Sequence, residues 1–271
     1  HRTPFAWDAL LGFLAPRAIP GVERVERFTY ERSIRVGDGW GAIRVSPSKR
    51  RARRLELHVR VFGAPLRAAD VTAITSRARR LFDLDADPEA IAATLSRDPE
   101  MAARVQATPG MRVPGAWDPL EIAVRAILGQ QVSVKGATTL AGRLVARYGE
   151  RPPELDGFSL FPRAQALDVD DLASIGLPGA RARSIRAVAH AAATGALPER
   201  PVDLVALPGV GPWTAAYVAM RSGDADAFPA SDLVLARRLG GSPREAARRA
   251  EIFRPYRAYA ALHVWSSGRE P

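Results

Sequence analysis

The sequence predicts an α+β N-terminal subdomain, a small antiparallel sheet with helices, packed on a mainly α-helical body. Two observations predict this division. Runs of alternating apolar and polar residues, such as Leu55 to Phe62 (LELHVRVF), occupy the first part of the chain, and a period of two is typical of half-buried strands. From Asp85 onward, apolar residues recur at helical spacing between capping residues and glycine or proline stops.

The N-terminal elements follow in order. A helix is expected over Trp7 to Ala15, because Pro16 stops its apolar pattern. Three strands come next, and then a helix that Asp70 opens and that ends near Phe82. The expected strands are Glu23 to Arg32, Gly41 to Val45 after a Gly-Asp-Gly turn, and Leu55 to Phe62.

The helical body has well-marked boundaries. Asp118 is followed by a proline and by Glu121, a combination typical of a helix start. Ser133 caps the next helix, and Ser242 opens another capping box. The expected helices are 119–129, 134–148, 163–174, 180–194, two helices flanking the turn at 208–211, then 233–239, 243–254 and 255–265.

Three subdomains are expected from these elements. Residues 1–84 form the α+β subdomain, and residues 108–225 form a helical subdomain. Residues 85–107 together with 226–271 form a second helical subdomain, which contains Asp232.

The composition excludes several kinds of site. The sequence has 39 Lys and Arg against 29 Asp and Glu, a net charge of +10, which favours a polyanionic partner without specifying which one. A general bias toward arginine is the alternative. There is no cysteine, so disulfides, thiolate metal sites, iron–sulfur clusters and thiol nucleophiles are excluded. No apolar run approaches the length of a membrane span.

The most informative segment is a Pro-Gly-x-Gly turn between two helices, Leu207-Pro208-Gly209-Val210-Gly211-Pro212-Trp213-Thr214. Its glycines allow the backbone to turn sharply and to come close to a bulky partner. The N–H groups of the turn and of the new helix point outward together, an arrangement suited to a phosphate. A turn used only for packing is the alternative.

A single acid follows this turn. Asp232 lies twenty-one positions after Gly211, at the start of the helix expected over 233–239, where the helix dipole favours a negative charge. A plain helix cap is the alternative role. A phosphate-binding turn followed by a single carboxylate predicts an enzyme that binds a nucleic-acid backbone and acts on a nearby nucleotide.

The chain resembles the helix-hairpin-helix superfamily of DNA glycosylases, and within it the bacterial 3-methyladenine DNA glycosylase II group. Four segments carry the resemblance, in the expected order along nearly the whole chain: WDALLGFLAPRAIPGVE (7–23), AILGQQVSV (126–134), LPGVGPWTAAYVAMR (207–221) and YRAYAALHVW (256–265). The resemblance implies a helix-hairpin-helix glycosylase body, with the active cleft between that body and the terminal helices that carry Asp232 and Trp265.

The resemblance implies that Asp232 is the catalytic residue. Breaking an N-glycosidic bond builds positive charge on the deoxyribose, and a carboxylate beside the sugar stabilises that charge or orients a water. Relatives that also cut the DNA backbone have a lysine two residues after the second hairpin glycine, where this chain has Trp213. Without an amine there is no Schiff base, so a monofunctional glycosylase is expected.

Substrate selection is expected from aromatic side chains. The resemblance places Trp213, Tyr217, Trp265 and Phe13 around the base pocket. Electron-rich rings attract a cationic, alkylated base by roughly 0.5–2 kcal/mol. Packing in the core is the alternative role for each ring.

Contacts with the DNA backbone are implied for the hairpin. The amides of Gly209, Gly211 and Thr214 are expected to bind a phosphate. No cofactor is required, but the resemblance implies a monovalent cation, Na⁺ or K⁺, when DNA is bound. Its expected ligands are the backbone carbonyls of Val205, Leu207 and Val210.

The flipped base leaves a gap that family members fill with an inserted side chain. The resemblance selects Gln131, in the loop before Ser133, as this wedge. The best-known member has an apolar residue there, so a hydrogen bond from Gln131 to the orphaned partner base is the alternative.

We therefore expect a monofunctional DNA glycosylase that excises alkylated purines of the 3-methyladenine type from double-stranded DNA and leaves an abasic site. Two alternatives remain: a non-catalytic helix-hairpin-helix DNA-binding module, and a glycosylase for oxidised or deaminated bases. A monomer without a membrane partner is expected, associated with DNA in the bacterial cytoplasm. The first residue is His1 rather than methionine, which leaves open that the chain is part of a longer multidomain repair protein.

Overall fold

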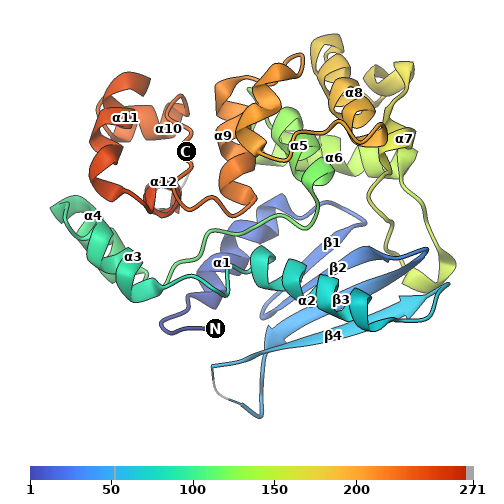
Figure 1. The fold of residues 1–271 in the computed structure, drawn as a ribbon, viewed down its shortest axis with the longest axis horizontal. Helices are drawn as coiled ribbons and strands as arrows, with labels where there is room; N and C mark the ends of the chain where they lie inside the picture. Colours follow the sequence, from blue (N-terminus) through green and yellow to red (C-terminus); the bar gives the residue numbers. More distant parts are fainter. Residues whose placement is uncertain (52, 267–271) are drawn as a thin grey trace.

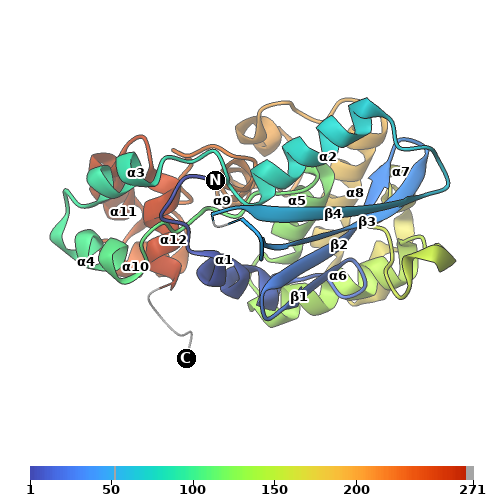
Figure 2. The same ribbon diagram turned by 90° about the horizontal axis from the view of Figure 1, so that it is seen from below.

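The computed structural model describes residues 1–51 and 53–266. A four-stranded antiparallel sheet with helices comes first and a mostly helical body follows (Figures 1 and 2), which confirms the predicted fold class. The last five residues of the expected subdomain range 226–271 lie outside the described part.

The N-terminal part places two helices against one sheet. Its strands follow one another across the sheet in the order β1-β2-β3-β4. The first helix, the strands and the second helix share one core, which includes Leu10, Tyr30, Ile43 and Ile74. The bounds are α1 (Trp7–Leu14), η1 (Ala15–Arg17), β1 (Glu23–Glu26), β2 (Thr29–Val36), β3 (Gly39–Pro47), β4 (Leu55–Phe62) and α2 (Ala68–Leu81).

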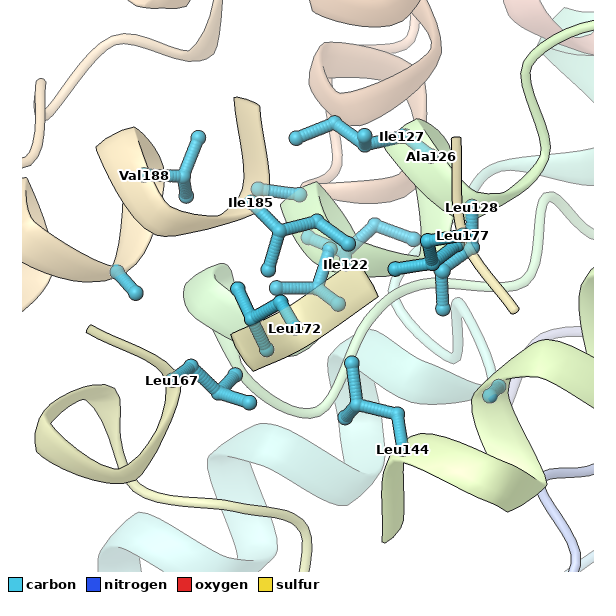
Figure 3. Close-up of a cluster of buried hydrophobic side chains, with 14 of the residues drawn as sticks. Ile122, Ala126, Ile127, Leu128, Leu144, Leu167, Leu172, Leu177, Ile185 and Val188 are labelled. Carbon is cyan, nitrogen blue, oxygen red and sulfur yellow. The ribbon is translucent and has the colours of Figure 1, made fainter. Parts of the chain in front are cut away.

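The helical body has two further cores. The bounds of its elements are α3 (Pro88–Leu95), α4 (Pro99–Ala107), α5 (Pro119–Leu128), α6 (Val134–Tyr148), η2 (Pro153–Leu155), α7 (Ala164–Leu167), η3 (Asp170–Ile175), α8 (Gly179–Ala193), η4 (Pro201–Ala206), α9 (Pro212–Arg221), α10 (Leu233–Arg238), α11 (Pro243–Ala250), η5 (Glu251–Phe253) and α12 (Arg257–Ser266). One core joins α5, α6, α8 and α9. Figure 3 shows its side chains from α5, α6 and α8. The other joins α3 and α4 to α10, α11 and α12.

Helix α9 connects these two cores. Its residues Ala215 and Val218 belong to the first core, whereas Ala219 and Met220 belong to the second. In Figures 1 and 2, α9 accordingly stands between α5 and α8 on one side and the α10–α12 group on the other. The turn before α9 and the start of α10 are thereby positioned by different cores.

The capping predictions are confirmed. The Asp118 carboxylate accepts hydrogen bonds from the amides of Leu120 (2.9 Å) and Glu121 (3.1 Å) at the start of α5. The Ser133 hydroxyl accepts from the Gly136 amide (3.1 Å) at the start of α6. None of the helices in the described residues is both long enough and apolar enough to span a bilayer.

The single strand predicted over Glu23 to Arg32 is wrong. The segment forms β1 and the start of β2, with Glu26 paired to Thr29 across a two-residue turn. No glycine, proline or asparagine marks this turn. A tertiary contact supports it instead, because the Trp7 indole N–H donates to the Phe28 carbonyl (3.1 Å).

Four helix predictions also need correction. Helix α2 begins at Ala68, and Asp70 accepts from the Arg67 amide (2.9 Å) rather than occupying the cap position. The helix before the Pro-Gly-x-Gly turn is the 3₁₀ helix η4, and the helix expected to reach residue 254 ends at Ala250. The helix expected over 163–174 divides into α7 and η3.

Tertiary contacts accompany the division of the helix expected over 163–174 into α7 and η3. The Asp168 carboxylate, which lies between α7 and η3, pairs with Arg186 (3.3 Å) and His190 (2.8 Å) of α8. These contacts tie the chain to α8 at the point where a continuous helix would have to pass.

Four charged side chains, three of them buried and that of Arg125 half-buried, join the sheet to α5. Arg32 of β2 pairs with Glu121 (2.6 Å), and Glu23 of β1 pairs with Arg125 (2.7 Å). Burial raises the pKa of Glu23, but the charges of Arg125 and Arg32 outweigh burial and lower that pKa to about 2. Arg125 also donates to the Arg17 carbonyl (2.6 Å), so the network fixes the end of η1 next to the site described below.

Candidate active site

The two hairpin glycines are required for different reasons. Gly209 has a φ of +74°, and a β-carbon on it would lie 1.8 Å from the Ser184 hydroxyl oxygen of α8. Gly211 has a φ of −85°, and a β-carbon on it would have nothing within 4 Å. The protein's own packing therefore explains Gly209 but not Gly211, whose open surroundings leave room for a partner.

This contrast gives a stability prediction. Gly209→Ala should destabilise the protein by about 1–2 kcal/mol or more, because the left-handed conformation is costly for any residue with a β-carbon. For a chain of this size, that loss corresponds to a fall in melting temperature of at least roughly 2–4 °C. Gly211→Ala, the matched control, should leave the melting temperature unchanged. Equal falls for both variants in thermal unfolding would contradict this account.

The amides predicted to bind phosphate have no partner within the described chain. The backbone N–H groups of Gly209, Gly211 and Thr214 donate to no other group of residues 1–51 and 53–266. They lie at the turn and in the first turn of α9, where Gly211 is the residue before the helix. Unpaired N–H groups at a helix start form an anion-binding arrangement.

Asp232 caps the N-terminus of α10, which is the role given above as the alternative to catalysis. Its Oδ1 accepts from the amides of Val234 (3.0 Å) and Leu235 (3.1 Å). Two indoles hold it as well: the Trp265 N–H donates to Oδ1 (3.0 Å), and the Trp213 N–H donates to Oδ2 (3.1 Å). The half-buried carboxylate is therefore fixed from three elements, α9, α10 and α12.

The two carboxylate oxygens of Asp232 differ in how many further hydrogen bonds they can accept. Oδ1 receives three of the hydrogen bonds, whereas Oδ2 receives only the Trp213 indole N–H among the described residues. A carboxylate oxygen has room for further acceptance. Oδ2 is therefore the atom that can face a developing positive charge or accept a proton from water.

Three of the predicted aromatic residues stand together at this carboxylate. Trp213 and Tyr217 stack with ring centroids 5.4 Å apart and planes 7° from parallel. The Tyr217 and Trp265 rings lie 6.3 Å apart at 54°. All three are half-buried rather than buried, so part of this aromatic wall remains accessible.

The fourth predicted aromatic residue, Phe13, lies beside two arginine side chains of the same chain. The Arg17 guanidinium lies 3.9 Å from the centroid of Phe13, and that of Arg221 lies 5.4 Å from it. Arg221 also donates to the Tyr217 hydroxyl (2.9 Å). Burial raises the pKa of Tyr217, but the charges of Arg221, Arg17 and Arg125 outweigh it and leave that pKa below its ordinary value.

The loop between α5 and α6 borders the hairpin. Gln131 is exposed there, with a φ of +55°. The side chain of the preceding residue, Gln130, donates hydrogen bonds to the Gly209 carbonyl and the Thr214 hydroxyl.

Three backbone carbonyls, those of Val205, Leu207 and Val210, are the predicted ligands of a monovalent cation. The Leu207 carbonyl accepts a hydrogen bond from the Val210 amide (3.1 Å).

Sequence reasoning missed several of these contacts. The indole bonds to Asp232 join residues 19 and 33 positions away from it, a separation without local periodicity. Arg221 and Gln130 also escaped notice. An arginine is a weak signal in a chain with 39 basic residues, so no pattern in the sequence marks Arg221.

Comparison with known proteins identifies the family. Residues 1–118 match the model of the AlkA N-terminal domain, and residues 124–249 match that of the HhH-GPD superfamily base excision DNA repair protein. The chain is 38% identical over 283 residues to DNA-3-methyladenine glycosylase 2 of Escherichia coli (strain K12), covering 99% of this chain and 96% of that protein. The chain belongs to the HhH-GPD superfamily.

Two further proteins are similar to this chain. The chain is 41% identical over 286 residues to a probable bifunctional transcriptional activator/DNA repair enzyme AlkA of Mycobacterium tuberculosis, covering all of this chain but only 56% of that protein. A structure of a 3-methyladenine DNA-glycosylase from Archaeoglobus fulgidus superposes with a TM-score of 0.80 at 22% identity, covering 96% of this chain and 94% of that one. The structural likeness shows a shared fold.

Proposed function

We propose that this chain is a monofunctional DNA glycosylase that excises alkylated purines of the 3-methyladenine type from double-stranded DNA and leaves an abasic site for base excision repair. The observation that carries the proposal is the placement of Asp232. Its carboxylate is fixed by the start of α10 and by the Trp213 and Trp265 indoles, at the edge of an aromatic wall. Trp213 directly precedes Thr214, whose backbone amide is one of the free hairpin amides. The name of the E. coli relative supports the same activity.

The residues account for the steps of such a reaction. The damaged nucleotide leaves the base stack, and its base packs on the wall formed by Trp213, Tyr217 and Trp265. When the C1′–N bond breaks, its electron pair goes to the base and positive charge develops on the sugar. Asp232 Oδ2 stabilises that charge. A water then adds to C1′ and gives its proton to Oδ2, which releases it to solvent. A cationic purine leaves as a neutral base, so the bond breaks readily.

The hairpin supplies the grip on the DNA backbone in this proposal. The unpaired amides of Gly209, Gly211 and Thr214 bind a phosphate near the lesion. We propose a Na⁺ or K⁺ ion beside them when DNA is bound. A carbonyl oxygen has two lone pairs, and that of Leu207 uses one for the Val210 amide. The carbonyls of Leu207, Val205 and Val210 would hold the ion, which adds positive charge toward the phosphate.

Absence of backbone cleavage follows from Trp213. The only lysines in the sequence are Lys49, after β3, and Lys135, in α6, and neither lies on the hairpin or on α9. An amine is needed for a Schiff base with the sugar. Borohydride reduction during turnover should therefore trap no covalent protein–DNA complex, and the DNA strand should stay intact until alkali is added. A trapped complex in denaturing electrophoresis would contradict the hydrolytic mechanism.

One observation favours a second candidate, a glycosylase for oxidised or deaminated bases. Arg17 and Arg221 lie over Phe13, and the positive charges around Tyr217 repel a cationic base. A neutral base meets no such repulsion. A panel of duplexes, each with one cationic or one neutral lesion, separates the two candidates by their relative excision rates.

The proposed function is tested by incubating the protein with methylated DNA and identifying the released bases by chromatography. Release of 3-methyladenine or 7-methylguanine is expected. A protein that binds this DNA but releases no base would be the non-catalytic binding module. We infer that the protein acts as a monomer on DNA in the bacterial cytoplasm.

A further inference from the structure

Gln130 joins two parts of the site and has no role in the chemistry described above. It is half-buried in the loop between α5 and α6. Its side-chain Nε2 donates to the Gly209 carbonyl (3.1 Å) and to the Thr214 hydroxyl (2.9 Å). A side-chain amide has two N–H donors, so both are used. Both acceptors belong to the turn and helix start whose free amides are proposed to bind phosphate.

The next residue along the chain is presented to solvent. Gln131 is exposed and has a φ of +55°, in the left-handed region that residues with a side chain seldom occupy. Such a conformation persists where the surrounding structure holds it. The two hydrogen bonds of Gln130, one residue earlier, tie this segment to the hairpin at that point.

The hairpin end of the connection is itself fixed. Thr214 is 2% exposed, and Gly209 packs against Ser184 of α8. Helices α5 and α9 also share a core. The Gln130 amide therefore connects the loop to a part of the protein that has little freedom to move.

We infer that Gln130 is a positioning residue that holds the Gln131 loop at a fixed spacing from the phosphate-binding turn. The inference rests on the proposed function, in which Gln131 enters the gap left by the flipped base. With the loop already ordered against the turn, its backbone loses less conformational freedom when Gln131 enters the duplex. Gln130 thus connects the turn that binds the DNA backbone to the residue that opens the base pair.

The test compares two duplexes that differ in the cost of flipping. One carries a single 7-methylguanine opposite cytosine, and the other carries the same lesion opposite an abasic site, where no base pair must be broken. Gln130→Met keeps the length of the side chain but removes its donors. Gln165→Met, an exposed glutamine of α7, is the matched control. Single-turnover excision and thermal unfolding are measured for each.

Gln130→Met should lower the single-turnover excision rate on the paired lesion by roughly 10-fold, the effect of losing one to two net hydrogen bonds. The rate on the lesion opposite the abasic site should stay within about 2-fold of the wild-type rate, because little flipping energy is needed there. Gln165→Met should match the wild type on both. The double variant Gln130→Met/Gln131→Ala should be no slower than Gln131→Ala, because the two residues act as one unit.

Three results would overturn the inference: additive losses in the double variant, an equal loss on both duplexes, or no loss for Gln130→Met. An equal loss together with a lower melting temperature assigns Gln130 a purely structural role. If the wild-type protein excises the lesion from neither duplex, the proposed function fails and this inference fails with it. If it excises from both and only the Gln130 results disagree, the proposed function stands.

Discussion

Asp232→Asn is expected to lower the rate of base excision by about 10²–10³-fold, the range found when one preorganised electrostatic contact to a transition state is removed. Asparagine caps a helix about as well as aspartate, so the amides of Val234 and Leu235 keep an acceptor. The negative charge that faces the sugar is lost. Single-turnover excision on a duplex with one alkylated purine measures the effect.

Asp118→Asn is the matched control for this experiment. Asp118 caps α5 through the same pair of backbone hydrogen bonds, and among the described residues no hydrogen bond joins its carboxylate to Trp213, Tyr217 or Trp265. Its replacement should leave the excision rate unchanged. Similar losses in the two variants would mean that Asp232 acts through helix capping alone.

Glu121→Gln is expected to destabilise the protein by about 3–5 kcal/mol, because breaking a buried ion pair leaves an uncompensated charge. Glu121 and Arg32 are 3% and 2% exposed, and their side chains meet at 2.6 Å. In a chain of this size, the loss should appear as a fall in melting temperature of at least roughly 6 °C.

Two controls accompany the Glu121 variant. The double variant Arg32→Met/Glu121→Gln should recover much of the loss, because it removes both charges and leaves Glu23 paired with Arg125. Glu245→Gln removes an exposed carboxylate that pairs with Arg248, and its melting temperature should stay at the wild-type value, since exposed pairs contribute little. A Glu121→Gln protein as stable as the wild type would show that the network does not hold the sheet to α5.

The parts of the fold that were predictable depend on local chemistry. The caps at Asp118 and Ser133 were predicted because a cap accepts hydrogen bonds from amides two or three residues away, and this spacing is visible in a sequence. The turn at Arg27 and Phe28 was missed because it has no turn residue of its own and is supported by a bond from Trp7. The ion network was missed because charged residues are ordinarily exposed.

The candidate site likewise has features that were predictable from the sequence and features that were not. The hairpin glycines and Asp232 could be selected from the sequence, because backbone turns and helix starts restrict which residues fit. The indole bonds from Trp213 and Trp265 depend on how α9, α10 and α12 pack, and no spacing in the sequence encodes that packing. The contrast between Gly209 and Gly211 likewise appears only with Ser184 in place.

The most direct test of the central claim measures DNA binding and base release together for the wild type and Asp232→Asn on the same methylated duplex. The account predicts that both proteins bind with equal affinity, that the wild type releases the alkylated base, and that the variant releases it at least about 100-fold more slowly. Release at the wild-type rate by Asp232→Asn, or binding without release by the wild type, would contradict the account.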